Sequence, residues 1–165
     1  MSVAPLLDEA TFRTVVASTP LIAIDLLVRL PDGRLLLGLR NNRPAQGFWF
    51  VPGGRIRKGE TLDAAFLRLT REELGVAISR NACSLLGVYE HFYEDSVFGG
   101  TKDTPTTHYI VLGYEVLFQP EIGKNLPLEQ HNRFQWFDIK DILSKEDVHF
   151  NTKIYMNDIK WNDVV

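Results

Sequence analysis

The stretch from Gly54 to Val76, GRIRKGETLDAAFLRLTREELGV, constrains the fold of this chain more than any other. A glycine-rich corner leads into a run in which apolar residues recur at i, i+3, i+4 and i+7, namely Leu62, Ala65, Phe66 and Leu69. This spacing predicts a helix over about residues 61–74 with one apolar face packed on a core. Gly75 follows directly and suits the left-handed residue that ends a helix.

Two adjacent glutamates, Glu72 and Glu73, fall in the last turn of this helix. Negative charge at a helix C-terminus opposes the helix dipole, so stability alone would favour Lys or Arg there. Carboxylates on a rigid helix that faces a loop of free backbone carbonyls suit a hard cation such as Mg²⁺. The alternative is that both are solvated surface charges, with Arg68 and Glu72 forming an i, i+4 pair.

Length and composition limit the number of domains and the classes of function that this chain can have. A chain of 165 residues fits one domain, and we expect residues 1–165 to fold as a single unit. The net charge of −3 gives no electrostatic footprint for nucleic acid, and no apolar stretch is long enough to span a membrane. The single cysteine, Cys83, cannot form an internal disulfide and no signal peptide is visible, so we expect a cytoplasmic protein.

Hydrophobic periodicity and turn residues place the other elements. We expect helices over 8–17, 139–143 and 148–162, and strands over 21–29, 35–40, 48–51, 84–93, 106–118 and 134–137. Residues 94–105 form a long glycine-bearing loop, which is typical of a mobile active-site loop. Strands and helices mix without a regular βαβ order, which predicts an α+β fold with helices on both sides of a sheet.

Several polar residues outside the helix stretch are candidates for binding. Asp25 interrupts an apolar strand, so its charge is paired, functional or turned to solvent. Arg40 and Arg43 flank two asparagines, and the planar arginine fork binds phosphate, although a loop arginine is usually only solvated. Arg55 follows two glycines, where the backbone can approach a phosphate closely.

Three further candidates are two histidines and a glutamine. His91 lies in an aromatic-rich strand end, although a lone histidine more often packs in a core or lies on the surface. Gln130 and His131 form a more pointed pair. A Gln carbonyl can ligate Mg²⁺, and a neighbouring imidazole can take a proton from water.

The stretch from Gly54 to Val76 resembles the Nudix box, G-x5-E-x7-R-E-U-x-E-E-x-G-U, in which U is a bulky aliphatic residue. The matching positions are Gly54, Glu60, Arg68, Glu72, Glu73, Gly75 and Val76. Leu69 departs from the pattern by replacing the first glutamate of the R-E pair, and Thr70 replaces an aliphatic residue. The replaced glutamate usually helps to hold metal, so this departure argues against the usual multi-metal site.

Most of the chain is similar to one Nudix subgroup, the GDP-mannose mannosyl hydrolases. The matching segments are Ser18–Leu21, Asn42–Gly54, Arg68–Thr70, His91–Tyr93, Thr106–Tyr109 and Glu129–His131. The resemblance implies the Nudix fold, a mixed β-sheet sandwiched between helices (α/β/α), in a homodimeric enzyme. It also implies hydrolysis of GDP-mannose to GDP and mannose, by water attack on the anomeric carbon with inversion. GDP-glucose stays open as a second substrate.

The resemblance also implies roles for individual residues. One Mg²⁺ per subunit, replaceable by Mn²⁺, is held by the Gly53 carbonyl, Glu73 and Gln130, while His131 is the general base. The residues that support the departing GDP are Arg40, Arg55, Arg68 and Tyr109. Those that engage other parts of the substrate are Asp25, His91 and Phe12, the last of them near the guanine.

Two other functions stay open at this point. An ordinary Nudix pyrophosphohydrolase would attack phosphorus in a nucleoside diphosphate derivative, a function that the box supports and Leu69 opposes. A non-catalytic Nudix-like module would bind a nucleotide for regulation. The incomplete box favours that module, whereas the presence of Glu73, Gln130 and His131 together opposes it.

Overall fold

The computed structural model describes residues 6–122, 124, 126–127 and 131–160, without the side chains of residues 131 and 132. The helices are α1 (Glu9–Ser18), α2 (Leu62–Leu74), α3 (Ile139–Ser144) and α4 (Phe150–Lys153), with 3-10 turns η1 (Arg80–Ala82) and η2 (Ile154–Asn157). The strands are β1 (Leu21–Arg29), β2 (Leu35–Arg40), β3 (Trp49–Phe50), β4 (Gly53–Arg55), β5 (Ser84–Tyr93), β6 (Thr107–Leu117) and β7 (His131–Phe137). In this part of the chain no helix has both the length and the apolar character to cross a membrane.

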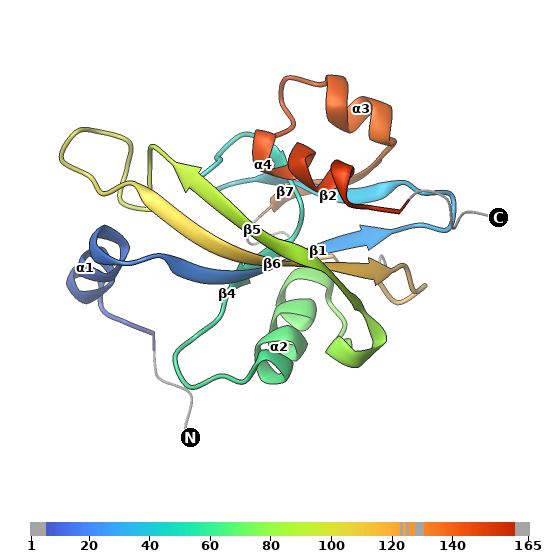
Figure 1. The fold of residues 1–165 in the computed structure, drawn as a ribbon, viewed down its shortest axis with the longest axis horizontal. Coiled ribbons are helices and arrows are strands. Elements are labelled where there is room, and N and C mark those ends of the chain that lie inside the picture. Colours follow the sequence, from blue (N-terminus) through green and yellow to red (C-terminus); the bar gives the residue numbers. More distant parts are fainter. Residues whose placement is uncertain (1–5, 123, 125, 128–130, 161–165) are drawn as a thin grey trace.

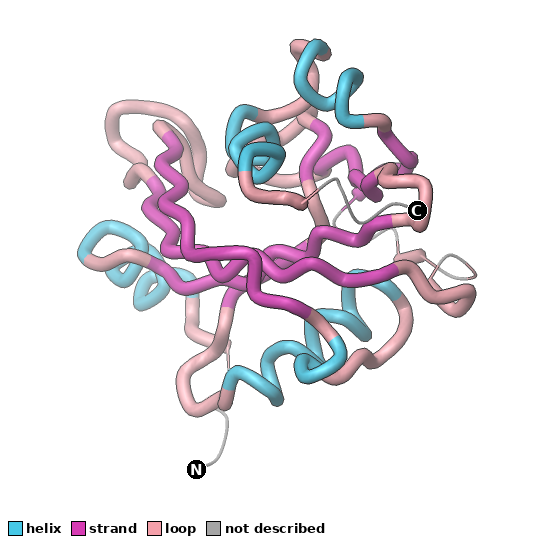
Figure 2. The backbone as a smooth tube through the Cα atoms, turned by 45° about the vertical axis from the view of Figure 1, so that its right-hand side comes forward, coloured by secondary structure: helices cyan, strands magenta, loops and turns pink. Residues whose placement is uncertain are grey.

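A mixed sheet organises these elements, with its strands in the order β3-β2-β1-β6-β5. β4 also pairs with β1, and β7 also pairs with β2. β1 and β6 run parallel, from Leu21 opposite Tyr109 to Arg29 opposite Leu117, whereas the other strand pairs are antiparallel. α2 covers one face of the sheet, and α3 and α4 cover the other (Figures 1 and 2). The predicted α+β fold with helices on both sides is therefore confirmed.

β1 is buried along nearly its whole length, which explains its almost continuous apolar sequence. The core on the α2 side contains Ile24, Leu26 and Val28 of β1 together with Ala65, Phe66 and Leu69 of α2. The core on the opposite side contains Leu27 of β1 together with Trp49, Phe50, Phe137 and Tyr155. Because successive side chains of a strand alternate between faces, Asp25 shares the face of Leu27 and not the face of α2.

α2 begins and ends where its sequence predicts. The Thr61 hydroxyl caps its first turn by accepting a hydrogen bond from the Ala64 amide at 3.1 Å. Gly75 ends the helix in the left-handed conformation, with φ at 75°. Three of the four residues predicted on its apolar face are buried, whereas Leu62 is 41% exposed. The prediction is wrong at Leu62 because this first residue of the helix lies outside the packed core.

The C-terminal segment differs from the helix predicted over residues 148–162. α4 ends at Lys153, and the chain then tightens into the 3-10 turn η2. The buried positions still follow helical spacing: Asn151, Thr152, Tyr155, Met156 and Ile159. A helical segment is therefore confirmed here, and its predicted length was wrong, because the tighter turn replaces a continued α-helix.

Two strands also differ from the sequence prediction. β4 was expected only as a glycine corner, because glycine is depleted in strands. Pairing with β1 overrides this preference, and Gly53 lies opposite Asp25. β7 begins at His131 rather than at Phe134, since its backbone pairs along β2 as far as Arg40.

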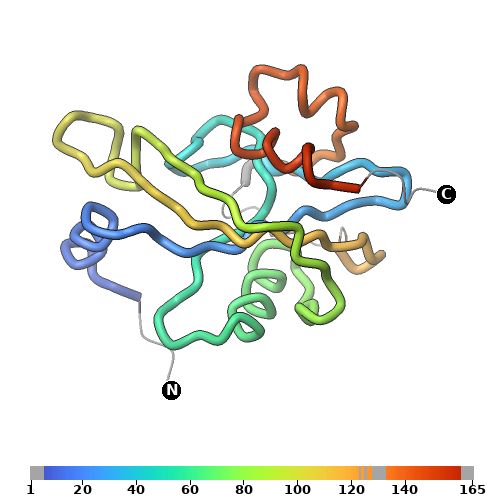
Figure 3. Tube along the Cα trace, viewed as in Figure 1, coloured from blue at the N-terminus to red at the C-terminus, as the bar shows by residue number. Residues whose placement is uncertain are grey.

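α1 and the loop between β5 and β6 lie at the same end of the sheet (Figure 3). Arg13 of α1 donates a hydrogen bond from Nη2 to the Asp103 carbonyl of this loop. The Phe12 ring packs against Phe98 with 5.6 Å between the ring centroids. The helix therefore fixes one side of the loop that the sequence marks as a candidate active-site segment.

Candidate active site

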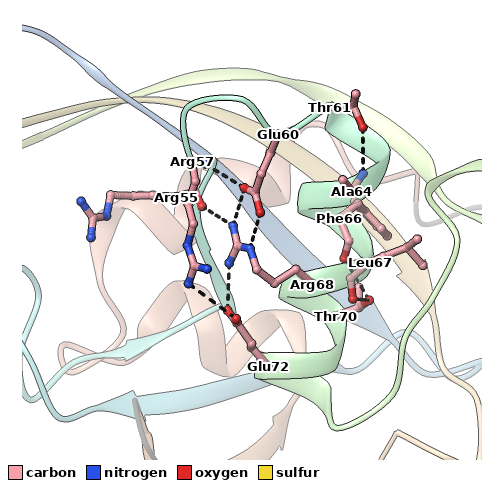
Figure 4. A network of polar contacts seen from close by, with 10 residues as sticks. All are labelled: Arg55, Arg57, Glu60, Thr61, Ala64, Phe66, Leu67, Arg68, Thr70 and Glu72. Atoms are coloured by element: carbon pink, nitrogen blue, oxygen red, sulfur yellow. Dashed lines mark hydrogen bonds and ion pairs between the residues drawn. The ribbon is translucent and has the colours of Figure 1, made fainter. Parts of the chain in front are cut away.

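An ion-pair network around Arg68 joins α2 to the loop that precedes it (Figure 4). Arg68 Nη2 donates to Glu60 Oε2 at 2.8 Å, and Nη1 donates to Glu72 Oε2 at 2.8 Å. Nε also donates to Glu60, and Nη2 reaches the Arg55 carbonyl at 2.9 Å. The i, i+4 pair of Arg68 and Glu72 that belongs to the alternative interpretation is therefore present, but that interpretation is wrong for Glu73, which is 3% exposed. All three guanidinium nitrogens are engaged within the protein, so the contact of Arg68 with a departing pyrophosphate stays a prediction.

Two of the three glutamates of the box, Glu60 and Glu72, are held by arginines. The side chain of Glu60 is 3% exposed, and its hydrogen bond with Arg68 lowers the pKa of Glu60. Glu72 is more open, and its Oε1 also lies 3.6 Å from Arg57 Nη2. These two carboxylates therefore hold the box loop against α2.

Asp25 is buried, at 7% exposed, on the sheet face opposite to α2. The Tyr155 hydroxyl donates a hydrogen bond to Asp25 Oδ2 at 2.6 Å, and it lies 3.2 Å from His91 Nε2. Burial raises the pKa of Asp25 to about 7; the Tyr155 hydrogen bond and the charge of Arg40 oppose this rise, while the charge of Glu73 adds to it. The solvent-exposed alternative for Asp25 is therefore wrong.

His91 lies beside this carboxylate and is 2% exposed. Burial lowers the pKa of His91 to about 4, and the positive charge of His149 acts in the same direction. The imidazole is therefore neutral near pH 7. Its ring packs edge-on against Phe50 and Tyr155, with centroids 6.0 and 5.8 Å away.

Tyr155 is the member of this cluster that the sequence did not indicate. Its hydrogen bond to Asp25 spans 130 positions in the chain, so no local pattern connects the two residues. The helix predicted over residues 148–162 contains Tyr155 but assigns it no role. The three residues come from β1, β5 and η2, and we call Asp25, His91 and Tyr155 the Asp25 cluster.

Tyr109 adjoins the Asp25 cluster as the cross-strand neighbour of His91. Burial raises the pKa of Tyr109, while the positive charges of Arg55 and Arg40 act to lower it. Arg40 is fixed by a hydrogen bond from its Nε to the Pro44 carbonyl at 2.9 Å. The structure thus brings together three of the residues expected to face the departing GDP.

Arg55 and Phe12, both predicted site residues, are in direct contact. Arg55 Cζ lies 4.0 Å from the centroid of the Phe12 ring. Figure 4 shows that the Arg55 side chain points away from Arg68, Glu60 and Glu72. The guanidinium and the ring of α1 form one stacked surface, which suits both a phosphate and a planar base.

Two of the three expected metal ligands lie close to Asp25. Gly53 is packed so tightly that an added Cβ would stand 2.5 Å from the Ile24 carbonyl oxygen and 2.6 Å from Asp25 Oδ1. Glu73 is 3% exposed, and its charge reaches Asp25. A buried carboxylate and a backbone carbonyl are the oxygen donors that Mg²⁺ and Mn²⁺ take, so these residues fit such an ion.

The remaining two predicted residues of the metal and base site cannot be placed as side chains. Gln130 lies outside the described residues. His131 contributes its backbone, which pairs with Arg40, while its side chain is outside the description. Among the residues that are described, no group of three or more His, Cys, Asp or Glu could hold a metal ion. The metal site, with Gln130 as one of its ligands, therefore stays a prediction.

An open groove of about 520 Å³ lies next to the Asp25 cluster and was not anticipated from the sequence. Its wall includes Tyr93 of β5 and His149, which precedes α4, with 5.3 Å between their ring centroids. An ion pair between Arg43 Nη1 and Asp95 Oδ2, at 2.9 Å, joins two of its lining residues. The C-terminal segment therefore contributes to both the buried cluster and the groove.

A mixed sheet between helices, with a glutamate-bearing helix after a glycine-rich strand, is the arrangement of a NUDIX domain. The model of the NUDIX domain family matches residues 19–157, and the chain belongs to this family. It is a Nudix hydrolase by this membership.

Known relatives and structures agree with this assignment. The chain is 40% identical over 133 residues, 80% of each protein, to the low-salt glycan biosynthesis protein Agl8 of Haloferax volcanii. It is 39% identical over 70 residues to the ADP-ribose pyrophosphatase of Methanocaldococcus jannaschii, covering 42% of this chain and 40% of that one. The crystal structure of the MutT NUDIX hydrolase from Burkholderia pseudomallei matches with a TM-score of 0.67 at 24% identity, over 87% of this chain and 100% of that one.

Proposed function

We propose that this Nudix hydrolase converts GDP-mannose, or the related GDP-glucose, to GDP and the free sugar. Water attacks the anomeric carbon with inversion, and the enzyme works as a Mg²⁺-dependent homodimer. The observation that carries the proposal is Leu69, which stands in place of a box glutamate and is 2% exposed in the α2 core.

Neither Glu60 nor Glu72 is free to act as a metal ligand in place of the glutamate that Leu69 replaces. The Leu69 side chain packs so closely on Gly54 that an added Cβ there would lie 2.7 Å from Leu69 Cδ2. Glu60 and Glu72 are engaged by Arg68. Glu73 is buried, and its charge reaches Asp25, which supports a site with few anionic ligands.

Such a site suits a reaction in which a good leaving group departs from carbon. Mg²⁺, when bound by the Gly53 carbonyl, Glu73 and Gln130, supplies positive charge for the departing diphosphate. Arg40 and Arg55, with the Tyr109 hydroxyl, can donate hydrogen bonds to the same phosphates.

The Asp25 cluster suits the sugar end of the same reaction. The transition state of glycoside cleavage has oxocarbenium-ion character, so positive charge develops on the sugar ring. A buried carboxylate offsets this charge more strongly than an exposed one, because the local dielectric is low. We assign Asp25 and the neutral His91 to the sugar, and His131 to the deprotonation of the attacking water.

The relative from Haloferax volcanii supports this substrate class. Its name places it in glycan biosynthesis, and nucleotide sugars are the activated donors of that chemistry. The match to an ADP-ribose pyrophosphatase favours the alternative, which is attack at phosphorus. That reaction would convert GDP-mannose to GMP and mannose 1-phosphate.

Hydrolysis in ¹⁸O-labelled water separates these functions. We expect the label in mannose, unlabelled GDP, and β-mannose as the first anomer seen by NMR. Label in a phosphate, or GMP among the products, would mean attack at phosphorus. Binding of GDP-mannose without any Mg²⁺-dependent turnover would indicate the regulatory module instead.

His131→Ala tests the assignment of the base. Loss of a general base lowers kcat by about 10²–10⁴-fold, with little change in KM. His149→Ala removes a second histidine that lies near the Asp25 cluster and serves as the comparison. Wild-type kcat in the His131 variant would remove this residue from the mechanism.

A further inference from the structure

The Tyr155 hydroxyl lies between two groups that the proposed function assigns to the sugar. It is 2.6 Å from Asp25 Oδ2 and 3.2 Å from His91 Nε2. Tyr155 is fully buried at 0% exposed, while Asp25 and His91 are 7% and 2% exposed. A phenol in this position can set the geometry of both neighbours without reaching the substrate.

The single hydroxyl proton decides the direction of these hydrogen bonds. When Asp25 is ionised its carboxylate can only accept, so in that state Tyr155 donates its proton to Asp25. Towards His91 the phenol oxygen can then only accept, which assigns the hydrogen of the neutral imidazole to Nε2. The result is a chain in which His91 donates to Tyr155 and Tyr155 donates to Asp25.

Packing holds the phenol in place independently of Asp25. The Tyr155 ring lies edge-on to Tyr89, with 4.6 Å between centroids. Gly113 lies beneath both rings, and an added Cβ would stand 2.9 Å from Tyr89 Cε2 and 3.2 Å from Tyr155 Cε1. The Tyr89 hydroxyl donates to Asp158 Oδ2 at 2.9 Å, which ties the chain just after Tyr155 to β5.

We propose that Tyr155 is a positioning residue for the sugar-hydrolysis reaction, acting through Asp25 and His91. This inference rests on the proposed function. The hydroxyl occupies Oδ2 of Asp25 and directs Oδ1 towards Gly53, where the expected metal ligands lie. It also selects one tautomer of His91, so that the other ring nitrogen is an acceptor. Groups held in this way need no reorientation as charge develops on the sugar.

A double-mutant cycle on GDP-mannose tests this role. Tyr155→Phe keeps the ring and removes the hydroxyl, and we expect kcat to fall about 10-fold with KM within about threefold. Asp25→Asn alone should lower kcat by about 10²-fold. If Tyr155 acts through Asp25, the double variant should be no slower than Asp25→Asn.

Tyr89→Phe is the matched control for this cycle. It removes a hydroxyl from the same pair of stacked rings, but that hydroxyl faces Asp158 and not Asp25. We expect its kcat to stay within about twofold of the wild type. Equal losses of kcat in Tyr89→Phe and Tyr155→Phe would mean that both hydroxyls act only through packing, and this would overturn the proposal. Additive effects of Tyr155→Phe and Asp25→Asn in the double variant would also overturn it.

The His91 tautomer provides a measurement that does not depend on turnover. Two-bond ¹H–¹⁵N spectra of the wild type should place the hydrogen on Nε2, and Tyr155→Phe should mix the tautomers. A wild-type hydrogen on Nδ1 would overturn the hydrogen-bond chain. A wild type that leaves GDP-mannose intact would instead overturn the proposed function, so the two failures are distinguishable.

Discussion

The Arg68 network and the Asp25 cluster stabilise carboxylates in opposite ways. In the first, Arg68 faces Glu60 and Glu72 within eight positions of the chain, and it lowers the pKa of Glu60. In the second, Asp25 receives its hydrogen bond from a neutral phenol far along the chain, and burial raises its pKa to about 7. One region neutralises its carboxylates, and the other leaves a carboxylate short of positive charge.

This difference indicates that the Arg68 network has a structural role, whereas the Asp25 cluster is suited to a role in the reaction. A carboxylate already matched by a guanidinium gains little from a further cation, so the Arg68 network is suited to hold the box loop. A buried carboxylate matched mainly by a phenol gains more when positive charge develops nearby. The Asp25 cluster is therefore the region where a change of charge in the substrate would be felt most strongly.

Removing the central cation of the Arg68 network is expected to have the largest effect on stability. Arg68→Ala leaves Glu60, whose side chain is 3% exposed, with the Arg57 amide but without its cationic partner. Breaking a buried pair on one side costs about 3–5 kcal/mol of the free energy of unfolding, and we expect the loss of this partly buried pair at the lower end of that range. Urea unfolding at pH 7.5 measures the loss.

The surface pair of Arg34 and Asp32 is the control for that measurement. Its atoms lie 2.7 Å apart, but the side chains are 42% and 52% exposed. Arg34→Ala should leave the unfolding midpoint unchanged within error, because solvent screens an exposed pair. Similar losses in both variants would mean that the Arg68 network is no more than a surface contact.

The Asp25 cluster makes stability depend on pH through His91. The pKa of His91 is about 4 in the fold, against 6.5 for an unperturbed histidine, so the unfolded chain binds the proton first as the pH falls. The stability that the neutral ring provides is complete above pH 6.5 and is lost between pH 6.5 and 4. The contribution of His91 to the free energy of unfolding is about 3 kcal/mol above pH 6.5, and it falls to zero below pH 4.

His91→Gln isolates this contribution, because an amide can replace the hydrogen bond but does not titrate. Unfolding by urea at pH 7.5 and at pH 4.5 should show a smaller acid loss in the variant than in the wild type. Other acid-sensitive groups are common to both proteins and cancel in the difference. Parallel pH curves would show that His91 is not held neutral by the fold.

Glu73 and Glu72 provide a comparison between the two regions within one helical turn. Glu73 is buried and its charge reaches Asp25, whereas Glu72 pairs with Arg68. Glu73→Gln should raise the dissociation constant for Mg²⁺ at least about 10–100-fold, since loss of a residue that only supports a metal ligand already costs that much. Glu72→Gln should change it by less than about threefold. Mn²⁺ titration followed by EPR measures both, and equal effects would contradict the assignment of Glu73.

The sequence predicted α2 and its contacts, which join residues close together in the chain. It did not predict the Asp25 cluster, whose contacts join residues far apart in the chain. The helix spacing, the Gly75 terminus and the Arg68–Glu72 pair all depend on residues a few positions apart, so a pattern along the chain contains them. The mixed sheet followed from the strand runs and from the Nudix resemblance. Leu62 was misplaced because periodicity does not show where a core ends.

The Asp25 cluster depends on contacts that the chain order conceals. Asp25 and His91 were candidates, but Asp25 looked equally compatible with solvent until β4 and η2 covered it. Tyr155 and the groove residue His149 belong to a segment whose helix length was predicted wrongly. A hydrogen bond formed across 130 positions exists only once the sheet has formed, so no spacing rule could have indicated it.

The N-cap of α2 is expected to give the smallest effect and to sharpen the comparison of the two regions. Thr61→Ala removes the hydroxyl that accepts from the Ala64 amide, and it should lower the free energy of unfolding by about 1 kcal/mol. In a chain of this size that is a fall in Tm of about 2–4 °C, which calorimetry resolves. Thr61→Ser keeps the acceptor and should restore most of the loss. Because the cap and the Arg68 network both hold the start of the box helix, a cap loss as large as that of Arg68→Ala would mean that the backbone of α2, and not the ion pairs, fixes the box loop.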